Sequence, residues 1–286
     1  MLFRSETTAT HLFDEGRIDI LTRVPALDFP RLQKRGVLRT DPFLATYYLG
    51  FNCRKGLSAR REWRRKVSGA IRREELARAV ATGETPSRSW IPPGLEGFIE
   101  WKGDAEMSSA LGAAPHGTAH EAREARTPRE GVDAIYDASS RNAMVMEKVQ
   151  QDVRRNAGVD LRLSQLDWKA FVRMIQTSPP PIFRFGWLAP FKDPISHLQA
   201  MTTGNPNNNT GCSVPAYDRL VREIALLTPG TVREGKIREA QRILVDEEAV
   251  VAPLYHYVQN HAVSSRVANF RVNPFGVIRF EELKLK

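Results

Sequence analysis

The stretch that decides the fold is residues 132–166, VDAIYDASSRNAMVMEKVQQDVRRNAGVDLRLSQL. It opens with a short apolar strand over 132–136. Apolar residues then recur at helical spacing, at Ala143, Met146, Val149 and Val153. Gly158 stands where such a helix ends, and Val159, Leu161 and Leu163 alternate as in a strand. A strand, a helix and a strand within about 30 residues predict a right-handed parallel crossover.

The same pattern repeats directly afterwards. Asp167 is a suitable cap for a helix whose apolar positions are Trp168, Phe171, Val172 and Ile175. A strand over 182–187 follows three prolines. An aromatic-rich strand over 42–51, a helix over 232–244 and a strand over 250–255 complete the main elements. These elements predict an α/β fold with a mostly parallel sheet.

Length and composition exclude several classes of protein. The chain has 286 residues, of which 42% are hydrophobic, enough to bury a core in one large domain or two modest ones. No apolar run reaches the roughly 18 residues of a membrane span, which excludes an integral membrane protein. The first six residues turn polar too early for a secretory signal, so we expect no signal peptide in this chain.

Two cysteines, Cys53 and Cys212, are too few for a disulfide framework, and their spacing matches no metal or redox motif. We interpret them as two unpaired thiols. The alternative is a single bridge, formed if the protein meets an oxidising compartment.

Most of the net charge of +9 comes from residues 54–88, which hold eleven Lys and Arg against four Glu. Beneath the charges, Trp63, Val67, Ala70 and Ile71 recur at helical spacing. We therefore interpret the segment as an amphipathic helix with a solvated basic side. A nucleic-acid-binding face is the alternative, although no helix-turn-helix, finger or RNA-binding signature accompanies it.

Motifs for catalysis are absent from the sequence: it has no GxSxG, no Walker motif, no GxGxxG and no HExxH. We therefore expect no enzymatic activity and no cofactor. His116 and His120 have the i, i+4 spacing of metal ligands, but Gly117 weakens a helix there. We interpret them as surface histidines and expect no metal, with a metal site as the alternative.

Ligands of open α/β sheets bind beyond the carboxyl ends of parallel strands, where residues 137–142 and 188–194 lie here. Arg141, beside a helix N-terminus, is suited to a carboxylate, and Asp193 is suited to a positive group. With Arg184 nearby and Trp187 as a flat wall, the set favours a zwitterion such as a short peptide. Alternatively, both arginines are solvated or paired with neighbouring carboxylates.

Seven short motifs then occur in a familiar order: 46–52 (TYYLGFN), 70–76 (AIRREEL), 92–94 (PPG), 158–159 with 167–168, 186–187 with 193–194, 217–218, and 253–255 (PLY). From near residue 7 to its end, the sequence resembles the oligopeptide- and dipeptide-binding proteins of ABC importers, extracellular solute-binding protein family 5. The resemblance implies a periplasmic-binding-protein type II fold. It also implies an exported two-lobed protein that closes around a peptide and delivers it to a membrane permease.

For the site, the resemblance implies that Arg141 and Asn142 contact the peptide carboxylate and that Arg184 contacts the ligand. It implies that Trp187 lines the pocket, and it adds Tyr255 to the ligand-binding residues. Asp193, which is suited to a positive group, completes the predicted set. Pro190 departs from the family pattern, because relatives often place there the aspartate that holds the peptide amino group.

The resemblance also implies the domain organisation. Residues 1–44 are a remnant of the first lobe, 45–257 the complete second lobe, and 258–286 the return to the first. We expect an N-terminally truncated solute-binding component whose full-length parent is periplasmic or lipid-anchored. Its ligand is a short peptide or similar molecule held between the lobes, and its partner is an inner-membrane permease. The alternative is a nucleic-acid-binding module that uses residues 54–88.

If the first lobe is incomplete, apolar strand faces near the N-terminus lack a cover. We therefore predict that the isolated chain is poorly soluble or oligomeric. Size-exclusion chromatography with light scattering checks this. A monodisperse monomer that unfolds cooperatively would contradict the domain boundaries above.

Overall fold

The computed structural model describes residues 6–103 and 131–286. Within them, seven strands form one sheet in the order β1-β7-β2-β6-β4-β5, and β3 pairs with β7. In this order, the strands are β1 (Ile20–Leu21), β7 (Val251–Val263), β2 (Leu38–Phe51), β6 (Ile182–Leu188), β4 (Val132–Asp137) and β5 (Leu161–Leu166), with β3 at Thr85–Pro86.

The crossover predicted over 132–166 is confirmed. β4 and β5 are parallel neighbours joined by α6 (Ser140–Ala157). The Ser139 hydroxyl accepts the Asn142 N–H at the start of α6, and Gly158 ends it in the left-handed conformation with φ 65°. The predicted cap of α7 (Trp168–Thr177) is also present, since Asp167 accepts two backbone N–H groups.

The prediction of a mostly parallel sheet is wrong. β4 is parallel to β5 and β6, but β2 pairs antiparallel with both β6 and β7, and β1 and β3 pair antiparallel with β7. The sheet is therefore mixed. The apolar pattern of a strand reports its burial, whereas its direction relative to its neighbours depends on long-range pairing that the pattern does not encode.

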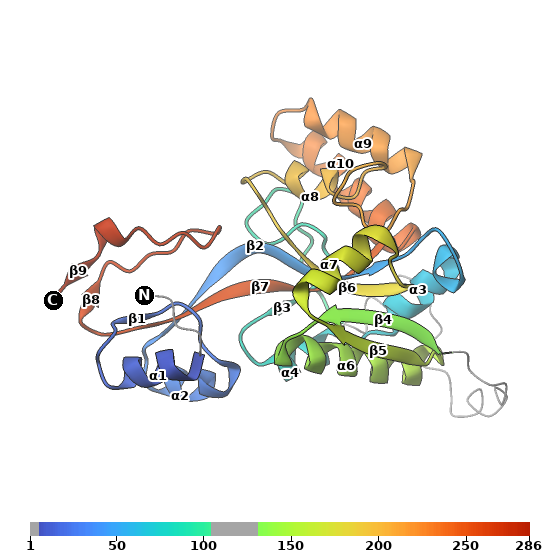
Figure 1. Ribbon diagram of the computed structural model, residues 1–286. Coiled ribbons are helices and arrows are strands. Elements are labelled where there is room, and N and C mark those ends of the chain that lie inside the picture. The colour runs from blue at the N-terminus through green and yellow to red at the C-terminus, as the bar shows by residue number, and fades with distance from the viewer. Residues whose placement is uncertain (1–5, 104–130) are drawn as a thin grey trace.

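Helices cover both faces of the sheet (Figure 1). On one face lie α6, α3 (Arg61–Ala70) and α4 (Arg73–Val80), packed on a core that includes Tyr47, Leu49 and Tyr255. We call this the α6 face. The opposite core includes Tyr48, Trp90 and Tyr217 and is covered by α8 (Ile195–Gln199), α9 (Pro215–Ala225) and α10 (Thr231–Gln241). A π-helical turn (Arg242–Glu247) continues α10 toward β7.

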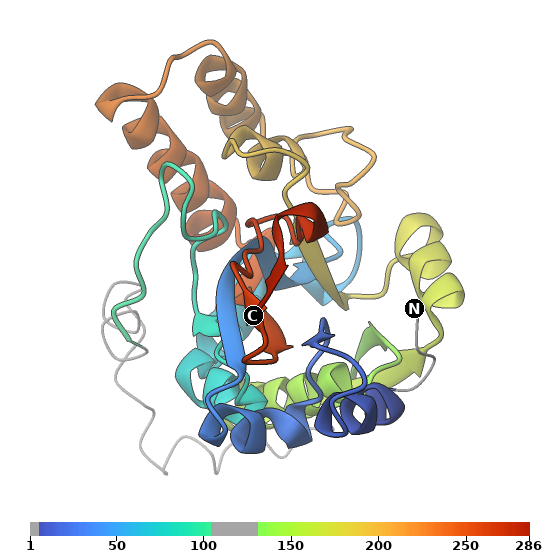
Figure 2. The same cartoon turned by 90° about the vertical axis from the view of Figure 1, so that its left-hand side faces the viewer.

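β2 and β7 extend beyond this main body and carry a smaller part of the molecule at their far ends (Figures 1 and 2). That part contains α1 (Glu6–Asp14), α2 (Phe29–Lys34), β1, and the C-terminal pair β8 (Val267–Ala268) and β9 (Lys284–Leu285). The expected boundaries at 44/45 and 257/258 fall inside β2 and β7. The pairing of these strands shifts register between Pro42 and Thr46. Large apolar side chains are exposed on the smaller part, among them Leu27, Val277, Phe280 and Leu285.

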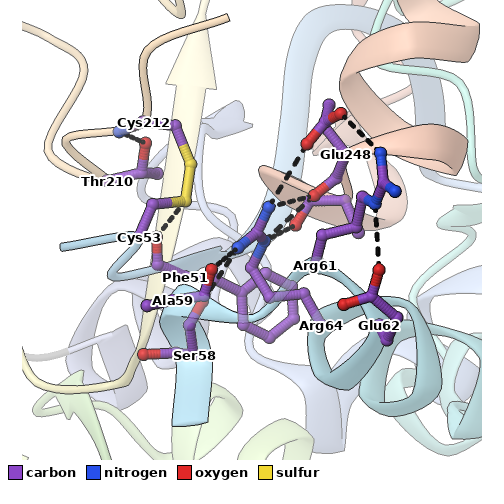
Figure 3. Close-up of polar contacts among 11 residues, drawn as sticks. Phe51, Cys53, Ser58, Ala59, Arg61, Glu62, Arg64, Thr210, Cys212 and Glu248 are labelled. Carbon is purple, nitrogen blue, oxygen red and sulfur yellow. Dashed lines mark hydrogen bonds and ion pairs between the residues drawn. A yellow bond between two sulfur atoms is a disulfide. The ribbon is translucent and has the colours of Figure 1, made fainter. Parts of the chain in front are cut away.

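Cys53 and Cys212 form a disulfide with a Cα–Cα distance of 5.0 Å, so the interpretation of two unpaired thiols is wrong (Figure 3). The bridge joins the end of β2 to a loop 159 residues later. The Cys53 N–H also donates to the Thr210 carbonyl at 2.9 Å. The spacing of two cysteines in the sequence does not predict a contact between segments so far apart in the chain.

The basic segment 54–88 contains two helices, α3 and α4, instead of one, and its apolar positions at Trp63 and Val67 face the core as predicted. Its basic side is not wholly solvated, because Arg64, Arg73 and Arg88 are buried. The Arg64 guanidinium donates to the carbonyls of Ser58, Ala59, Glu248 and Ala249 (Figure 3). Burial lowers the pKa of Arg64.

Arg64 thus ties α3 to the turn before β7. We predict that Arg64→Met lowers the free energy of unfolding by about 2–4 kcal/mol, because it leaves buried carbonyls without a donor. Urea unfolding measures the loss. Arg65→Met, at the exposed neighbouring position of α3, is the matched control and should change stability by less than about 0.5 kcal/mol. Equal effects of the two substitutions would contradict this role of Arg64.

Two histidines, His197 and His256, are buried on the face opposite α6, and the Nε2 atom of each lacks a hydrogen-bond partner among the described residues. Burial lowers the pKa of each to about 3. The unfolded chain binds these protons near pH 6.5, whereas the folded protein does not. Stability is therefore full above about pH 6.5 and falls as the pH drops toward about 3.

We predict that each of these histidines contributes a slope of up to about 1.4 kcal/mol per pH unit in that window. His256→Gln should flatten the profile of unfolding free energy against pH by this amount. Urea unfolding at a series of pH values between 7 and 4 measures the slope. The same substitution at exposed His11 is the matched control. If His256→Gln leaves the slope of unfolding free energy against pH unchanged, His256 has the same pKa in the folded and unfolded states.

Candidate functional site

Four of the six predicted site residues gather on the α6 face, near the start of α6. Arg141 and Asn142 come from α6, Arg184 from β6 and Tyr255 from β7. Two further tyrosines, Tyr47 of β2 and Tyr257 of β7, lie among them. We call these six residues the arginine–tyrosine cluster. It is assembled by neighbouring strands of the sheet and by the helix that follows the carboxyl end of β4.

Arg184 is the buried centre of this cluster, with 9% of its surface exposed. Its guanidinium pairs with Asp137, donates to the Tyr257 hydroxyl at 2.8 Å, and lies 4.3 Å from the centre of the Tyr47 ring. Burial acts to lower the pKa of Arg184, but the neighbouring Tyr47, Tyr257 and Asp137 raise it above its ordinary value. Arg184 is therefore a permanent cation that holds three partners in place.

Arg141 is also paired with a carboxylate. It donates to Glu84 at 2.7 Å and to the Thr82 hydroxyl at 3.2 Å. The Glu84 side chain is completely buried, whereas that of Arg141 is 34% exposed. The sequence left open whether the two arginines are free or paired, and both are paired. Of the two, Arg141 is the one that solvent or a ligand can reach.

Asn142 is buried, and its side chain has partners in the protein. Its Oδ1 accepts from the Tyr47 hydroxyl at 3.0 Å, and its amide donates to the Asp137 carbonyl at 3.1 Å. Its backbone N–H donates to Ser139. In this structure Asn142 positions Tyr47 and the strand end at Asp137.

Tyr255 has an unused polar group, as Arg184 has at its Nε atom. Its ring stacks on Tyr47 with centroids 4.5 Å apart, and its hydroxyl is buried without a hydrogen-bond partner among the described residues. Burial raises the pKa of Tyr255 well above its ordinary value, so the phenol stays protonated. A buried hydroxyl of this kind is uncommon, because most buried polar groups have a hydrogen-bond partner.

Trp187 and Asp193 lie away from the cluster. Successive side chains of β6 alternate between faces, and Trp187 packs on the core opposite α6 while Arg184 lies on the α6 face. The Trp187 indole donates to the Ser196 carbonyl at 3.1 Å. Asp193 accepts two hydrogen bonds from Arg233, at 2.6 and 2.8 Å. The positive group that Asp193 pairs with here is therefore an arginine of the protein.

Sequence reasoning missed an exposed aromatic surface beside β6. Trp168 was counted among the core positions of its helix, yet it is 56% exposed at the first position of α7. Its ring is parallel to that of Phe185, with centroids 6.3 Å apart, and Phe191 beyond the end of β6 is exposed as well. The position of Trp168 directly after the cap Asp167 could have indicated its exposure, because side chains in the first turn of a helix often extend beyond the helix end. Tyr47 and Tyr257 carried no comparable signal.

Among the described residues, no group of three or more His, Cys, Asp or Glu side chains is arranged to hold a metal ion. His116 and His120 lie outside the described residues. No helix in the described part of the chain is long and apolar enough to cross a membrane.

The family model for bacterial extracellular solute-binding proteins, family 5, middle region, matches residues 1–209. The chain belongs to this family. The oligopeptide-binding protein OppA of Bacillus subtilis is 26% identical over 267 residues, which are 90% of this chain and 49% of OppA. The periplasmic murein peptide-binding protein MppA of Escherichia coli is 25% identical over 281 residues, 94% of this chain and 51% of MppA.

Solved structures of family members share the fold. That of E. coli MppA superposes with a TM-score of 0.80 and 25% identity, covering 97% of this chain and 56% of MppA. OppA of Haemophilus influenzae in complex with RPPGFSPFR has a TM-score of 0.80 at 18% identity, covering 98% and 56%. The periplasmic-binding-protein fold is thus confirmed. The chain spans about half the length of the curated relatives that it matches.

Proposed function

We propose that this chain is the ligand-binding second lobe, with parts of the first, of the peptide-binding component of an ABC importer. The observation that carries the proposal is membership of a solute-binding family, together with similarity to oligopeptide- and murein-peptide-binding proteins. Family 5 is a solute-binding family, and we infer no catalysis and no cofactor. The partners are a peptide-like ligand and a permease of the inner membrane.

In this proposal residues 45–257 are the second lobe, and residues 1–44 and 258–286 belong to the first. β2 and β7 are the two connections between the lobes, and the register shift after Pro42 is where they bend. A ligand that touches both lobes stabilises the closed form by its higher affinity for that form.

We assign different roles to the predicted site residues. Arg141 contacts a carboxylate of the ligand through its exposed part, and the buried Tyr255 supports the site by stacking on Tyr47. Arg184 and Asn142 position the tyrosines. On the face of the sheet opposite α6, Trp187 and the exposed Trp168 each provide a flat apolar wall, and Asp193 acts through its pair with Arg233.

We infer that the full-length protein works outside the cytoplasmic membrane, in the periplasm or as a lipid-anchored protein. Two observations support this location. Relatives in E. coli are named as periplasmic proteins. The Cys53–Cys212 disulfide also suits an oxidising compartment.

Nucleic-acid binding through residues 54–88 is not proposed. Arg64, Arg73 and Arg88 of that segment are buried, and Arg88 donates to Asp246 at 2.7 Å. These guanidinium groups are bound within the protein and are not available to phosphates.

We predict that the oxidised chain binds trialanine or the nonapeptide RPPGFSPFR saturably in isothermal titration calorimetry. Trp168→Ala should weaken that binding about tenfold, because it removes an exposed aromatic wall. Phe280→Ala, which removes an exposed aromatic side chain from the smaller part of the molecule, is the matched control. Absence of saturable heat with either peptide, or equal losses in the two variants, would contradict the proposal.

A further inference from the structure

A polar pocket of about 530 Å³ lies at the opposite end of β6 from Trp187. It is formed by the residues after β2, the end of α7, and the loop that carries Cys212. Its location follows from the chain: Asn52, at the end of β2, donates its N–H to Pro181 just before β6 begins. The lining residues are Arg54, Gln176, Thr203, Gly204, Asn205, Pro206, Asn208, Asn209, Gly211, Cys212 and Ser213.

The walls of this pocket are fixed by bonds within the protein. The Cys53–Cys212 disulfide joins its two sides. The Asn208 amide donates to the carbonyls of Met201, Thr202 and Cys212, and its Oδ1 accepts from Thr210. These bonds fix the conformation of the loop. A ligand would therefore bind a preformed surface, and little conformational entropy would be lost on binding.

Arg54 is exposed to solvent and lies beside Gly211. Gly211 has a left-handed backbone with φ 65°, and a Cβ atom there would lie only 2.7 Å from Arg54 Cζ. The guanidinium therefore rests where any other residue would place its side chain. No Asp or Glu lines the pocket, and Arg54 has no ion pair with a described carboxylate. The pocket thus offers one exposed positive charge that has no ion pair with a described carboxylate.

The segment that follows Arg54 in the chain adds to this charge. Lys55, Arg60, Arg65 and Lys66 are all exposed, while the nearby Glu62 is paired with Arg61. Positive charge gathered around a recess raises the local concentration of anions. The positive electrostatic potential therefore favours an acidic ligand.

We propose that this pocket binds a sugar acid, a small hydroxylated ring or chain that bears one carboxylate. The Arg54 guanidinium suits a carboxylate through two parallel hydrogen bonds. The carboxamides of Gln176 and Asn209 and the hydroxyl of Ser213 both donate and accept, as sugar hydroxyls require. No aromatic and no large aliphatic side chain lines the pocket, which disfavours an apolar ligand. This site is separate from the one proposed for peptides.

The test is a calorimetric titration of the oxidised 286-residue chain with sodium glucuronate at low salt, with glucose and acetate as comparison ligands. Glucuronate should bind saturably and at least about tenfold more tightly than either, since only it supplies both the charge and the hydroxyls. Arg54→Gln should weaken glucuronate binding by about tenfold or more. Arg60→Gln, an exposed arginine outside the pocket lining, is the matched control and should change affinity less than about twofold.

Three results would overturn the proposal. Glucuronate that binds no better than acetate or glucose would remove the sugar acid as the ligand class. Equal losses in Arg54→Gln and Arg60→Gln would mean that general charge attraction explains the binding. Saturable binding that Arg54→Gln leaves unchanged would place the site elsewhere. A thermal unfolding scan of each variant confirms that it is folded, and peptide binding, measured separately, is unaffected by any of these outcomes.

Discussion

The rest of the structure depends on the antiparallel pairing of β2 with β7, which joins residues 38–50 to residues 251–262. These two central strands belong to both parts of the molecule. Every other strand of the sheet attaches to one of them or to the parallel set that begins at β6. Tyr47 and Tyr255 face each other across this pair and carry the arginine–tyrosine cluster. A contact between segments about 200 residues apart thus supports both the architecture and the candidate site.

Internal pairing of charge is the second organising feature. Arg184 pairs with Asp137, Arg141 with Glu84, and Arg233 with Asp193 and Glu96. Buried arginines are tolerated because each meets carboxylates or several carbonyls, which offset the loss of water. The net charge of the chain therefore overstates the charge that a partner can reach. Near the bridge between Cys53 and Cys212, in contrast, Arg54 lines a pocket that has no Asp or Glu among its described lining residues.

The candidate site was predictable in part. Arg141 and Trp187 were predicted because they lie in or beside the loops that follow apolar strands, and Asn142 and Tyr255 because of the family resemblance. The arrangement was not predictable: Arg184 and Trp187 are three residues apart but lie on opposite faces of β6. Glu84 was missed because it reaches Arg141 only when β3 pairs with β7, and Tyr257 because it reaches Arg184 only when β7 pairs with β2. The sequence around a single glutamate or tyrosine contains no pattern that predicts such a role.

The sequence by itself determined the local units. The strand–helix–strand stretch over 132–166, the caps at Ser139 and Asp167, the stop at Gly158 and the apolar side of α3 all follow from neighbours within a few residues, and short ordered motifs identified the family. Only the tertiary structure decided the mixed direction of the sheet, the disulfide, and the carboxylate that each arginine meets. These depend on which distant segments pack together, and that choice is made by the burial of the whole core, which no single segment encodes.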